Sequence, residues 1–558
     1  MAQLASRKER PWWRDAVTYQ IYPRSFADSN GDGIGDVEGI RSRLPYLKSL
    51  GIDAIWISPW YPSPQHDHGY DVSDYMDIEP DYGTLAQAEQ LIKEALEFGI
   101  RLIVDIVPNH TSSDHKWFQA ALKAEPGSPE RERFIFRDGK GANGDLPPNN
   151  WEAVFGGPAW ERTTNADGTP GQWYLHLFAV EQPDVNWENP EVVEHFEDVL
   201  KFWLDRGVAG FRIDVAHGMF KEAGLPDIRT DPAAAMLGTE HKPFWDQEGV
   251  HDIYRAWRKI LDSYPGDRMA VAEAWVSPAE RIARYVRPDE LQNSFNFEML
   301  TTLWDATEIK TKIKNSIDAL AEVGAPTSWV FNNHDVVRSV DRLDLGLTNH
   351  GDTTISRQGD PKKFNIARGT LRARSAALMT LALPGGTYLY QGEELAVPEV
   401  RDIPEDRLTD PRWKMSGFSD RGRDGCRVPI PWSSKPEGAF GFSSNESLKP
   451  DHAWLPQSSW WGKFAVDTQD GVEGSTLSMY REALAIRKGE EGLGDGPMEW
   501  IEAGKDVVAF ERPGDFACYI NFGAAIQLPS NSQILVASGP VVGHTLPTDT
   551  AVWLRLIS

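Results

Sequence analysis

The chain has 558 residues, more than one ordinary hydrophobic core supports, so we expect two or three domains, one of them a large barrel. Apolar residues make up 41% and charged residues 25%, the composition of a globular protein without disordered tracts. The formal net charge is −26, and a surface this acidic repels phosphate backbones and anionic lipid. We therefore expect neither nucleic acid nor a membrane as partner. The acidity fits a small neutral substrate but does not by itself select one, and the oligomeric state stays open.

Cysteine and tryptophan are the two most informative residue types. Only two cysteines occur, Cys426 and Cys518, far apart in the chain, which excludes a disulfide framework and favours a reducing cytoplasm. Most of the 22 tryptophans are expected in an aromatic core. Others can line a sugar-binding surface, because a flat indole covers the C–H face of a pyranose.

Strand candidates alternate with amphipathic helices over the first 490 residues. Segments 38–51 and 85–99 have apolar residues at helical spacing, and both end near a glycine that precedes the next strand. Eight strand–helix repeats favour a (β/α)8 TIM barrel over a doubly wound open sheet. The predicted strands are residues 17–26, 54–60, 101–110, 208–217, 269–275, 294–299, 328–335 and 386–394.

Two regions depart from this alternation. Residues 111–185 are rich in Gly, Pro, Asn and Trp and too long for a connection, which predicts an inserted subdomain after the third strand. After a helix at 476–489, short alternating runs predict an all-β C-terminal domain. The expected division is a barrel at 1–110 and 186–490, subdomain B at 111–185 and a C-terminal β-sandwich at 491–558.

Polar side chains gather where four predicted strands end, the edge at which barrel enzymes carry their chemistry. A single acidic residue at such a place is equally well explained as a salt bridge or a helix cap. Three carboxylates on three strands, each beside Arg, His or Trp, point instead to a catalytic pocket. The residues at these strand ends are Asp105, Asn109, His110, Arg212, Asp214, Glu273, His334 and Asp335.

Converging carboxylates acquire different proton affinities, which a nucleophile and a general acid require. Glycoside cleavage with retention uses two carboxyl groups about 5–5.5 Å apart. Arg212, two residues before Asp214 on the same strand face, is expected to lower the pKa of Asp214 and keep it ionised. Glu273 lies between two alanines and near Trp275, an apolar setting that favours the protonated form of a general acid.

The segments "DIVPNH", "GFRIDVAH", "VAEAW" and "FNNHD", in this order, resemble the α-amylase family, glycoside hydrolase family 13. The opening "WWRDAVTYQIYPRSFADSNGDGIGDVEGI" and the late "RGRDGCRVPIPW" resemble its α-glucosidase and oligo-1,6-glucosidase branch. The resemblance implies a retaining, exo-acting α-glucosidase that releases glucose from the non-reducing end through a covalent β-glucosyl-Asp intermediate, with transglucosylation as a side reaction. The alternative is a trehalose synthase or a sucrose-acting isomerase or hydrolase; a non-enzymatic relative is disfavoured because all three carboxylates are present.

The resemblance also implies roles for individual residues. Asp214 matches the nucleophile, Glu273 the acid/base, and Asp335 the carboxylate that grips the 2- and 3-hydroxyls of the sugar. Tyr70 matches the platform beneath the glucose, and Asp71 with Arg423 matches a pair that closes the pocket in exo-acting members. The remaining matches are His110, His334, Arg212 and Phe178 as contacts of the first sugar or of the nucleophile.

Bond preference stays open at this point. The Lys-His pair that follows the nucleophile in endo-acting amylases is absent after Asp214, where the text is Val215-Ala216-His217, and this favours a closed pocket. Val215 after the nucleophile resembles the residue found in members that prefer α-1,6 bonds, but "VAHG" and "RVPIPW" both depart from the usual sequence of that group.

The stretch "DSNGDGIGD" (28–36) resembles half of an EF-hand loop. Counted from Asp28, oxygen ligands fall at positions 1, 3, 5, 7 and 9 and Gly33 at position 6, but the closing Glu at position 12 is missing. A solvated turn of Asx and Gly residues is the alternative. We expect a structural Ca²⁺, with Mg²⁺ as the second choice, and no organic cofactor; the predicted ligands are Asp28, Asn30, Asp32, the Ile34 carbonyl and Asp36.

Overall fold

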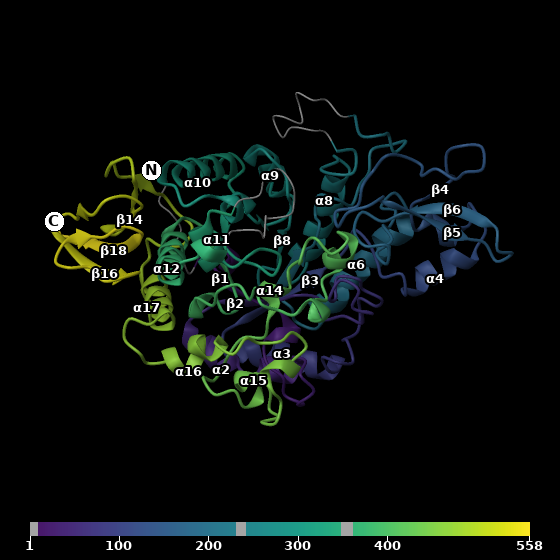
Figure 1. Ribbon diagram of the computed structural model, residues 1–558. Coiled ribbons are helices and arrows are strands. Elements are labelled where there is room, and N and C mark those ends of the chain that lie inside the picture. Colours follow the sequence, from purple (N-terminus) through teal and green to yellow (C-terminus); the bar gives the residue numbers. More distant parts are fainter. Residues whose placement is uncertain (1–8, 230–241, 348–360, 558) are drawn as a thin grey trace.

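The computed structural model describes residues 9–229, 242–347 and 361–557, and a barrel of eight parallel strands forms its centre (Figure 1). Neighbouring strands follow the order β10-β11-β1-β2-β3-β7-β8-β9, and an isolated parallel bridge between Asn296 and Trp329 joins the two ends. The predicted (β/α)8 fold and its eight strands are confirmed. The strands are β1 (Val17–Ile21), β2 (Ala54–Ile57), β3 (Arg101–Ile106), β7 (Gly210–Ile213), β8 (Met269–Ala272), β9 (Asn293–Ser294), β10 (Ser328–Val330) and β11 (Gly386–Tyr390).

Helices surround the strands, and their ends follow local sequence signals. Thr84 and Gln87 form a capping box at the start of the third helix, and Gly51, with φ 96°, ends the second. No helix in the described ranges is both long enough and apolar enough to span a bilayer. The main helices are α1 (Val37–Ser42), α2 (Leu44–Leu50), α3 (Leu85–Glu97), α6 (Pro190–Asp205), α8 (Val250–Asp262), α9 (Ala279–Tyr285), α10 (Ala306–Ala321), α11 (Ser339–Leu345), α12 (Ile366–Ala382) and α17 (Thr476–Gly489).

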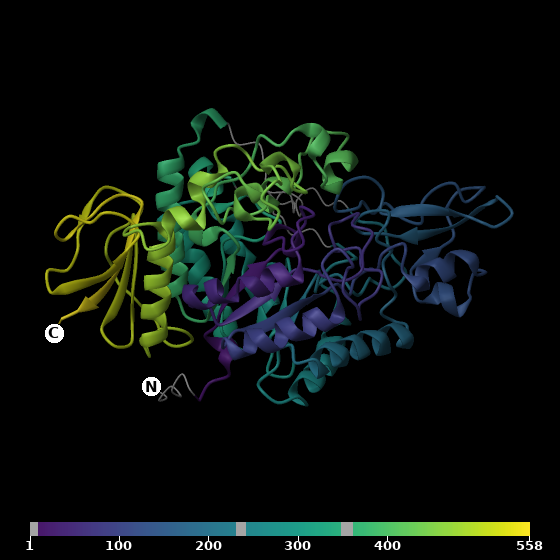
Figure 2. The same ribbon diagram turned by 90° about the horizontal axis from the view of Figure 1, so that it is seen from below.

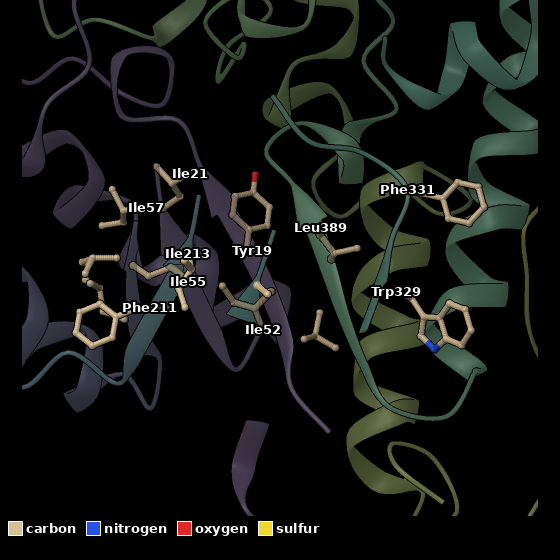
Figure 3. Close-up of a cluster of buried hydrophobic side chains, with 14 of the residues drawn as sticks. Tyr19, Ile21, Ile52, Ile55, Ile57, Phe211, Ile213, Trp329, Phe331 and Leu389 are labelled. Atoms are coloured by element: carbon tan, nitrogen blue, oxygen red, sulfur yellow. The ribbon is translucent and has the colours of Figure 1, made fainter. Parts of the chain in front are cut away.

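Side chains alternate between the two faces of each barrel strand. Ile55 and Ile57 of β2 belong to the large cluster between strands and helices, part of which Figure 3 shows, whereas Trp56 belongs to a separate cluster inside the barrel. The same period of two places Phe211 and Ile213 outward on β7. Arg212 and the following Asp214 therefore point inward.

Two further units flank the barrel on opposite sides (Figures 1 and 2). Between β3 and α6 lie α4 (Lys116–Lys123), α5 (Pro129–Glu132) and a three-stranded antiparallel sheet of β4 (Phe136–Arg137), β6 (Pro170–Leu175) and β5 (Trp160–Thr164). The C-terminal unit is all-β, as predicted, with the sheet order β12-β13-β14-β18-β16 and a separate pair, β15-β17. Its strands are β12 (Glu499–Trp500), β13 (Val507–Arg512), β14 (Phe516–Asn521), β15 (Ile526–Gln527), β16 (Ser532–Ala537), β17 (Thr545–Leu546) and β18 (Thr550–Leu556).

Short helical elements occupy the connections, most of them between β11 and α17. They are η1 (Trp12–Arg14), η2 (Pro23–Ser25), η3 (Phe297–Thr301), η4 (Pro361–Lys363), η5 (Glu393–Leu395), η6 (Glu405–Arg407), α13 (Pro411–Met415), α14 (Asp424–Arg427), α15 (Gly438–Gly441), η7 (Pro450–His452), η8 (Trp461–Phe464) and α16 (Val466–Gln469).

Candidate active site

A cavity of about 1780 Å³ lies where the barrel strands end, between the inserted subdomain and the segment that follows β11. The three predicted carboxylates, Asp214, Glu273 and Asp335, all line it, although they come from three different strands. Of the other predicted site residues, Tyr70, His110, Phe178, His334 and Arg423 line the same cavity.

Arg212 is the centre of the charge arrangement. Its Nη1 lies 2.6 Å from Asp214 Oδ1 and 2.8 Å from Asp105 Oδ1, and its Nη2 lies 2.7 Å from Glu273 Oε2. The arginine is 1% exposed, so these contacts are shielded from solvent. One guanidinium therefore fixes two carboxylates, Asp214 and Glu273, at the wall of the cavity.

The prediction of a lowered pKa for Asp214 is wrong. Burial raises the pKa of Asp214 well above its usual range; Arg212 opposes this shift, and the nearby carboxylates of Glu273 and Asp105 add to it. Burial likewise raises the pKa of Asp105 to about 7, against the effect of Arg212. Three carboxylates, Asp105, Asp214 and Glu273, therefore share one buried cation.

The prediction of an apolar setting for Glu273 is also wrong. Besides Arg212, its Oε2 accepts a hydrogen bond from the Val215 backbone N–H at 3.0 Å, and its Oε1 accepts one from Trp275 Nε1 at 3.3 Å. The alanines on either side point away because β8 alternates its faces: Ala272 and Ala274 pack in the outer cluster.

Asp335 is surrounded by donors. Arg423 Nη1 and Arg427 Nη2 each lie 3.0 Å from its Oδ1, and His334 Nε2 lies 3.2 Å from its Oδ2. Burial alone would raise the pKa of Asp335, but His334, Arg423 and Arg427 hold it well below its usual range. Gln20 Nε2 lies 2.7 Å from His334 Nδ1, which leaves Nε2 of the imidazole as the donor to Asp335.

The predicted pairing of Asp71 with Arg423 is wrong, because Asp67 is the partner: Arg423 Nη2 lies 2.7 Å from Asp67 Oδ1. Asp71 does not line the cavity. Its carboxylate accepts hydrogen bonds from Ser63 Oγ and from the backbone N–H groups of His66 and Asp67, at 2.8–3.0 Å. Asp71 thus shapes the loop that presents Asp67.

Tyr70 and His334 form the floor of the cavity as parallel rings, with centroids 5.2 Å apart and an interplanar angle of 3°. His110 Nε2 lies 3.1 Å from the Tyr70 carbonyl oxygen, and burial lowers the pKa of His110 to about 4, so its imidazole is neutral at pH 7. The ring centroids of Phe178 and His110 lie 5.2 Å apart. These contacts place the predicted sugar-binding residues side by side.

Sequence reasoning missed several wall residues. Phe155 from the inserted subdomain lies beneath the Arg423 guanidinium at 5.1 Å, and Trp245 packs on His217 with ring centroids 4.6 Å apart. Both come from long loops without a local pattern. Asp67 had a signal: it stands three residues before Tyr70 in the same segment that supplied Asp71.

In the loop at 28–36, the carboxylates of Asp28 and Asp36 accept hydrogen bonds from N–H groups of the loop and of the first turn of α1. Asp28 accepts from the N–H groups of Gly31 and Gly33, and Asp36 from those of Ser29, Asn30 and Gly39. Within the described ranges, no group of three or more His, Cys, Asp or Glu side chains is arranged to hold a metal ion. The oxygen-rich side chains and the left-handed Gly33 (φ 93°) still fit a hard cation. The Gly33 N–H donates a hydrogen bond to Asp28 at 2.8 Å, which fixes the turn at the centre of the loop.

Comparisons with known proteins agree with this geometry. The model of the alpha-amylase catalytic domain matches residues 20–496. A probable alpha-glucosidase of Rhizobium meliloti (strain 1021) is 36% identical over 551 residues, which cover 96% of this chain and 93% of that protein. An oligo-1,6-glucosidase of Parageobacillus thermoglucosidasius is 36% identical over 512 residues, which cover 86% and 84%.

Solved structures show the same likeness over nearly the whole chain. An alpha-glucosyl transfer enzyme superposes with a TM-score of 0.84 at 33% identity, covering 98% of this chain and 99% of its own. A trehalulose synthase from Pseudomonas mesoacidophila superposes with a TM-score of 0.80 at 29% identity, covering 98% and 100%. With the matched catalytic domain and three carboxylates at the ends of barrel strands, the chain belongs to the α-amylase family, glycoside hydrolase family 13.

Proposed function

We propose that the protein is a retaining, exo-acting α-glucosidase that removes glucose from the non-reducing end of maltose, isomaltose or short oligosaccharides. The single observation that carries this proposal is the Arg212 guanidinium, which holds Asp214 and Glu273 together at the cavity wall. Two carboxyl groups in close proximity suit a double displacement, since an inverting pair must leave room for a water between them.

In the first step Asp214 attacks the anomeric carbon while Glu273 gives its proton to the leaving oxygen, so the glycosidic bond breaks as the glucosyl–Asp214 bond forms. In the second step Glu273 takes a proton from water, and the water oxygen displaces Asp214 to release α-glucose. Arg212 stabilises whichever carboxylate carries the negative charge. The ionised Asp335 accepts hydrogen bonds from the sugar hydroxyls.

The ion pair of Asp67 with Arg423 supports exo action. Arg423 also contacts Asp335, so the three side chains form one wall of the cavity, with Phe155 beneath it. Such a wall would close the cavity beyond the non-reducing glucose.

The experiment that tests this proposal is product analysis on maltose, isomaltose and sucrose, with Asp214→Asn as the blank. Hydrolysis converts maltose to two glucoses, and the initial rates on the two glucose disaccharides give the bond preference. Some relatives carry other names, among them the trehalulose synthase and a trehalose-6-phosphate hydrolase of Bacillus subtilis that is 32% identical over 98% of this chain and 93% of that protein. An isomerised disaccharide with little free glucose would replace the hydrolase proposal by an isomerase.

We further propose that the loop 28–36 holds a structural Ca²⁺, with Mg²⁺ as the alternative, through Asp28, Asn30, Asp32, the Ile34 carbonyl and Asp36. When bound, the cation would fix the loop between β1 and α1 in place of the internal hydrogen bonds of its carboxylates. The same loop bridges to the segment after β11: Asp28 N–H bonds the Phe442 carbonyl at 2.8 Å. This role is one of stability, and no step of the reaction passes through the metal.

A cytoplasmic location is also part of the proposal. Both cysteines are buried free thiols, which suits a reducing compartment. The acidic net charge and the neutral His110 imidazole of the pocket support a small neutral sugar as substrate.

A further inference from the structure

Asp410 is a buried carboxylate that does not line the cavity but binds Arg423, an arginine of the cavity wall. Its Oδ2 accepts hydrogen bonds from Arg423 Nε at 2.7 Å and from the Arg423 backbone N–H at 2.6 Å, and its Oδ1 lies 3.3 Å from Arg423 Nη2. The residue is 1% exposed. One side chain therefore fixes both the backbone and the guanidinium of Arg423.

These hydrogen bonds from Arg423 to Asp410 fix the directions of Nη1 and Nη2 of the guanidinium. With Nε held by Asp410, Nη1 faces Asp335 at 3.0 Å and Nη2 faces Asp67 at 2.7 Å. A guanidinium is planar, so an acceptor on Nε and Nη2 determines where Nη1 points. The orientation of Arg423 toward the cavity thus depends on a residue that the substrate does not reach.

Neighbouring contacts keep the Asp410 carboxylate in place. Asp410 caps α13 by accepting from the Arg412 N–H at 3.0 Å, and its own N–H donates to Asp424 Oδ2 at 3.1 Å. A Cβ on Gly422 would lie 2.4 Å from Asp410 Cγ, so the carboxylate can occupy this position only beside a glycine. Burial would raise the pKa of Asp410, but Arg423 and Arg427 hold it well below its usual range, and the carboxylate stays charged.

We propose that Asp410 is a positioning residue for the glucosidase reaction, which holds Arg423 against Asp67 and Asp335 and so builds the closed end of the pocket. The inference rests on the proposed function, since the pocket end matters only if a terminal glucose binds there. Asp410 acts on the closed end of the pocket through Arg423 and touches no reacting atom.

The test compares kcat and KM on p-nitrophenyl α-glucoside and maltose for wild type, Asp410→Asn, Arg423→Lys and the double variant. We expect Asp410→Asn to lower kcat/KM about 10- to 100-fold, chiefly through KM, the effect of losing hydrogen bonds to a charged group. The double variant should be no worse than Arg423→Lys, because both changes disable the same wall. Losses that multiply in the double variant, or an unchanged KM in Asp410→Asn, would overturn the proposal.

Two further variants separate positioning from folding. Asp344→Asn is the matched control: Asp344 is a buried carboxylate away from the cavity that lies 2.5 Å from Arg368 Nε and accepts a hydrogen bond from the Asn365 N–H at 2.7 Å. This variant should lower Tm without changing KM. Gly422→Ala keeps every charge, but its Cβ would clash with the Asp410 carboxylate at a backbone position of φ +66°, so it should raise KM as Asp410→Asn does. If Asp410→Asn does not fold, an unchanged KM in a folded Gly422→Ala overturns the proposal. A wild type that cleaves neither substrate refutes the proposed function instead.

Discussion

Arg212 Nη1 lies 2.6 Å from Asp214 Oδ1, and both side chains are buried at the end of the same strand, β7. The second nitrogen of the guanidinium reaches Glu273, so the positive charge is shared. One guanidinium thus holds the proposed nucleophile and the proposed general acid next to each other at the cavity wall.

Glu273→Gln should separate substrates by their leaving groups. Maltose needs a proton on the departing oxygen, so we expect its turnover to fall about 10²- to 10⁴-fold, the usual contribution of a general acid. Glucosyl fluoride leaves without protonation and should lose far less in the glucosylation step. Steady-state kinetics on both substrates measure the difference, and equal losses on both would mean that Glu273 has a structural role.

Arg423 should couple energetically more strongly to Asp67 than to Asp71. In a double-mutant cycle of Asp67→Asn with Arg423→Lys, we expect an interaction energy in kcat/KM of about 0.5–3 kcal/mol, the range for residues in contact. The matched cycle with Asp71→Asn should give a smaller interaction energy, because Asp71 reaches Arg423 only through its hydrogen bond to the Asp67 backbone. Coupling to Asp71 and none to Asp67 would restore the pairing predicted from the sequence.

The acid limb of the pH profile should lie above the range of an ordinary aspartate. Activity needs ionised Asp214, and burial raises its pKa, so kcat/KM is present above that raised pKa and is lost as the pH falls through it. The measurement is kcat/KM on p-nitrophenyl α-glucoside across pH for wild type and Glu273→Gln, in which the limb should move to lower pH because the Glu273 carboxylate no longer adds to the raised pKa of Asp214. A wild-type limb at about 3.9, the value of an unperturbed aspartate, would contradict the account.

Chelation should lower stability and spare activity. A site filled at about 100 times its dissociation constant adds roughly 2.7 kcal/mol, so removing Ca²⁺ should lower Tm by a few degrees while the folded enzyme still turns over. Asp32→Ala is the control variant because it removes one proposed ligand at little structural cost. Asp32 is exposed, and its hydrogen bonds reach only Asn30 and Ile34 within the loop. A Tm that does not respond to Ca²⁺ or EDTA in the wild type refutes the metal site.

The sequence predicts the barrel and the positions of its carboxylates because both depend on short-range periodicity. Alternation along β7 and β8 places Arg212, Asp214 and Glu273 on the inner face, and the end of each strand defines the site. The pattern does not show which charges meet. Asp67 and Asp71 stand in one segment, and only the turn of the loop at 63–71 decides which of them reaches Arg423.

Charge environments were the least predictable property. The neighbours of Glu273 in the chain are alanines, but its spatial neighbours are Arg212 and the Val215 N–H, supplied by another strand. The shift at Asp214 depends on burial and on three carboxylates around one arginine, a balance that no sequence window contains. Asp410 is separated from Arg423 by α13 and a loop, so only the folded structure brings the two side chains together.

The most direct test is to trap the covalent intermediate with a slow fluorinated α-glucosyl fluoride and to map the labelled peptide by mass spectrometry. We expect one fluoroglucosyl group on Asp214, with turnover restored as the label is hydrolysed, and no label in Asp214→Asn. An active wild type that carries no label, or a label on another residue, would contradict the assignment of Asp214 as the nucleophile of a retaining glucosidase.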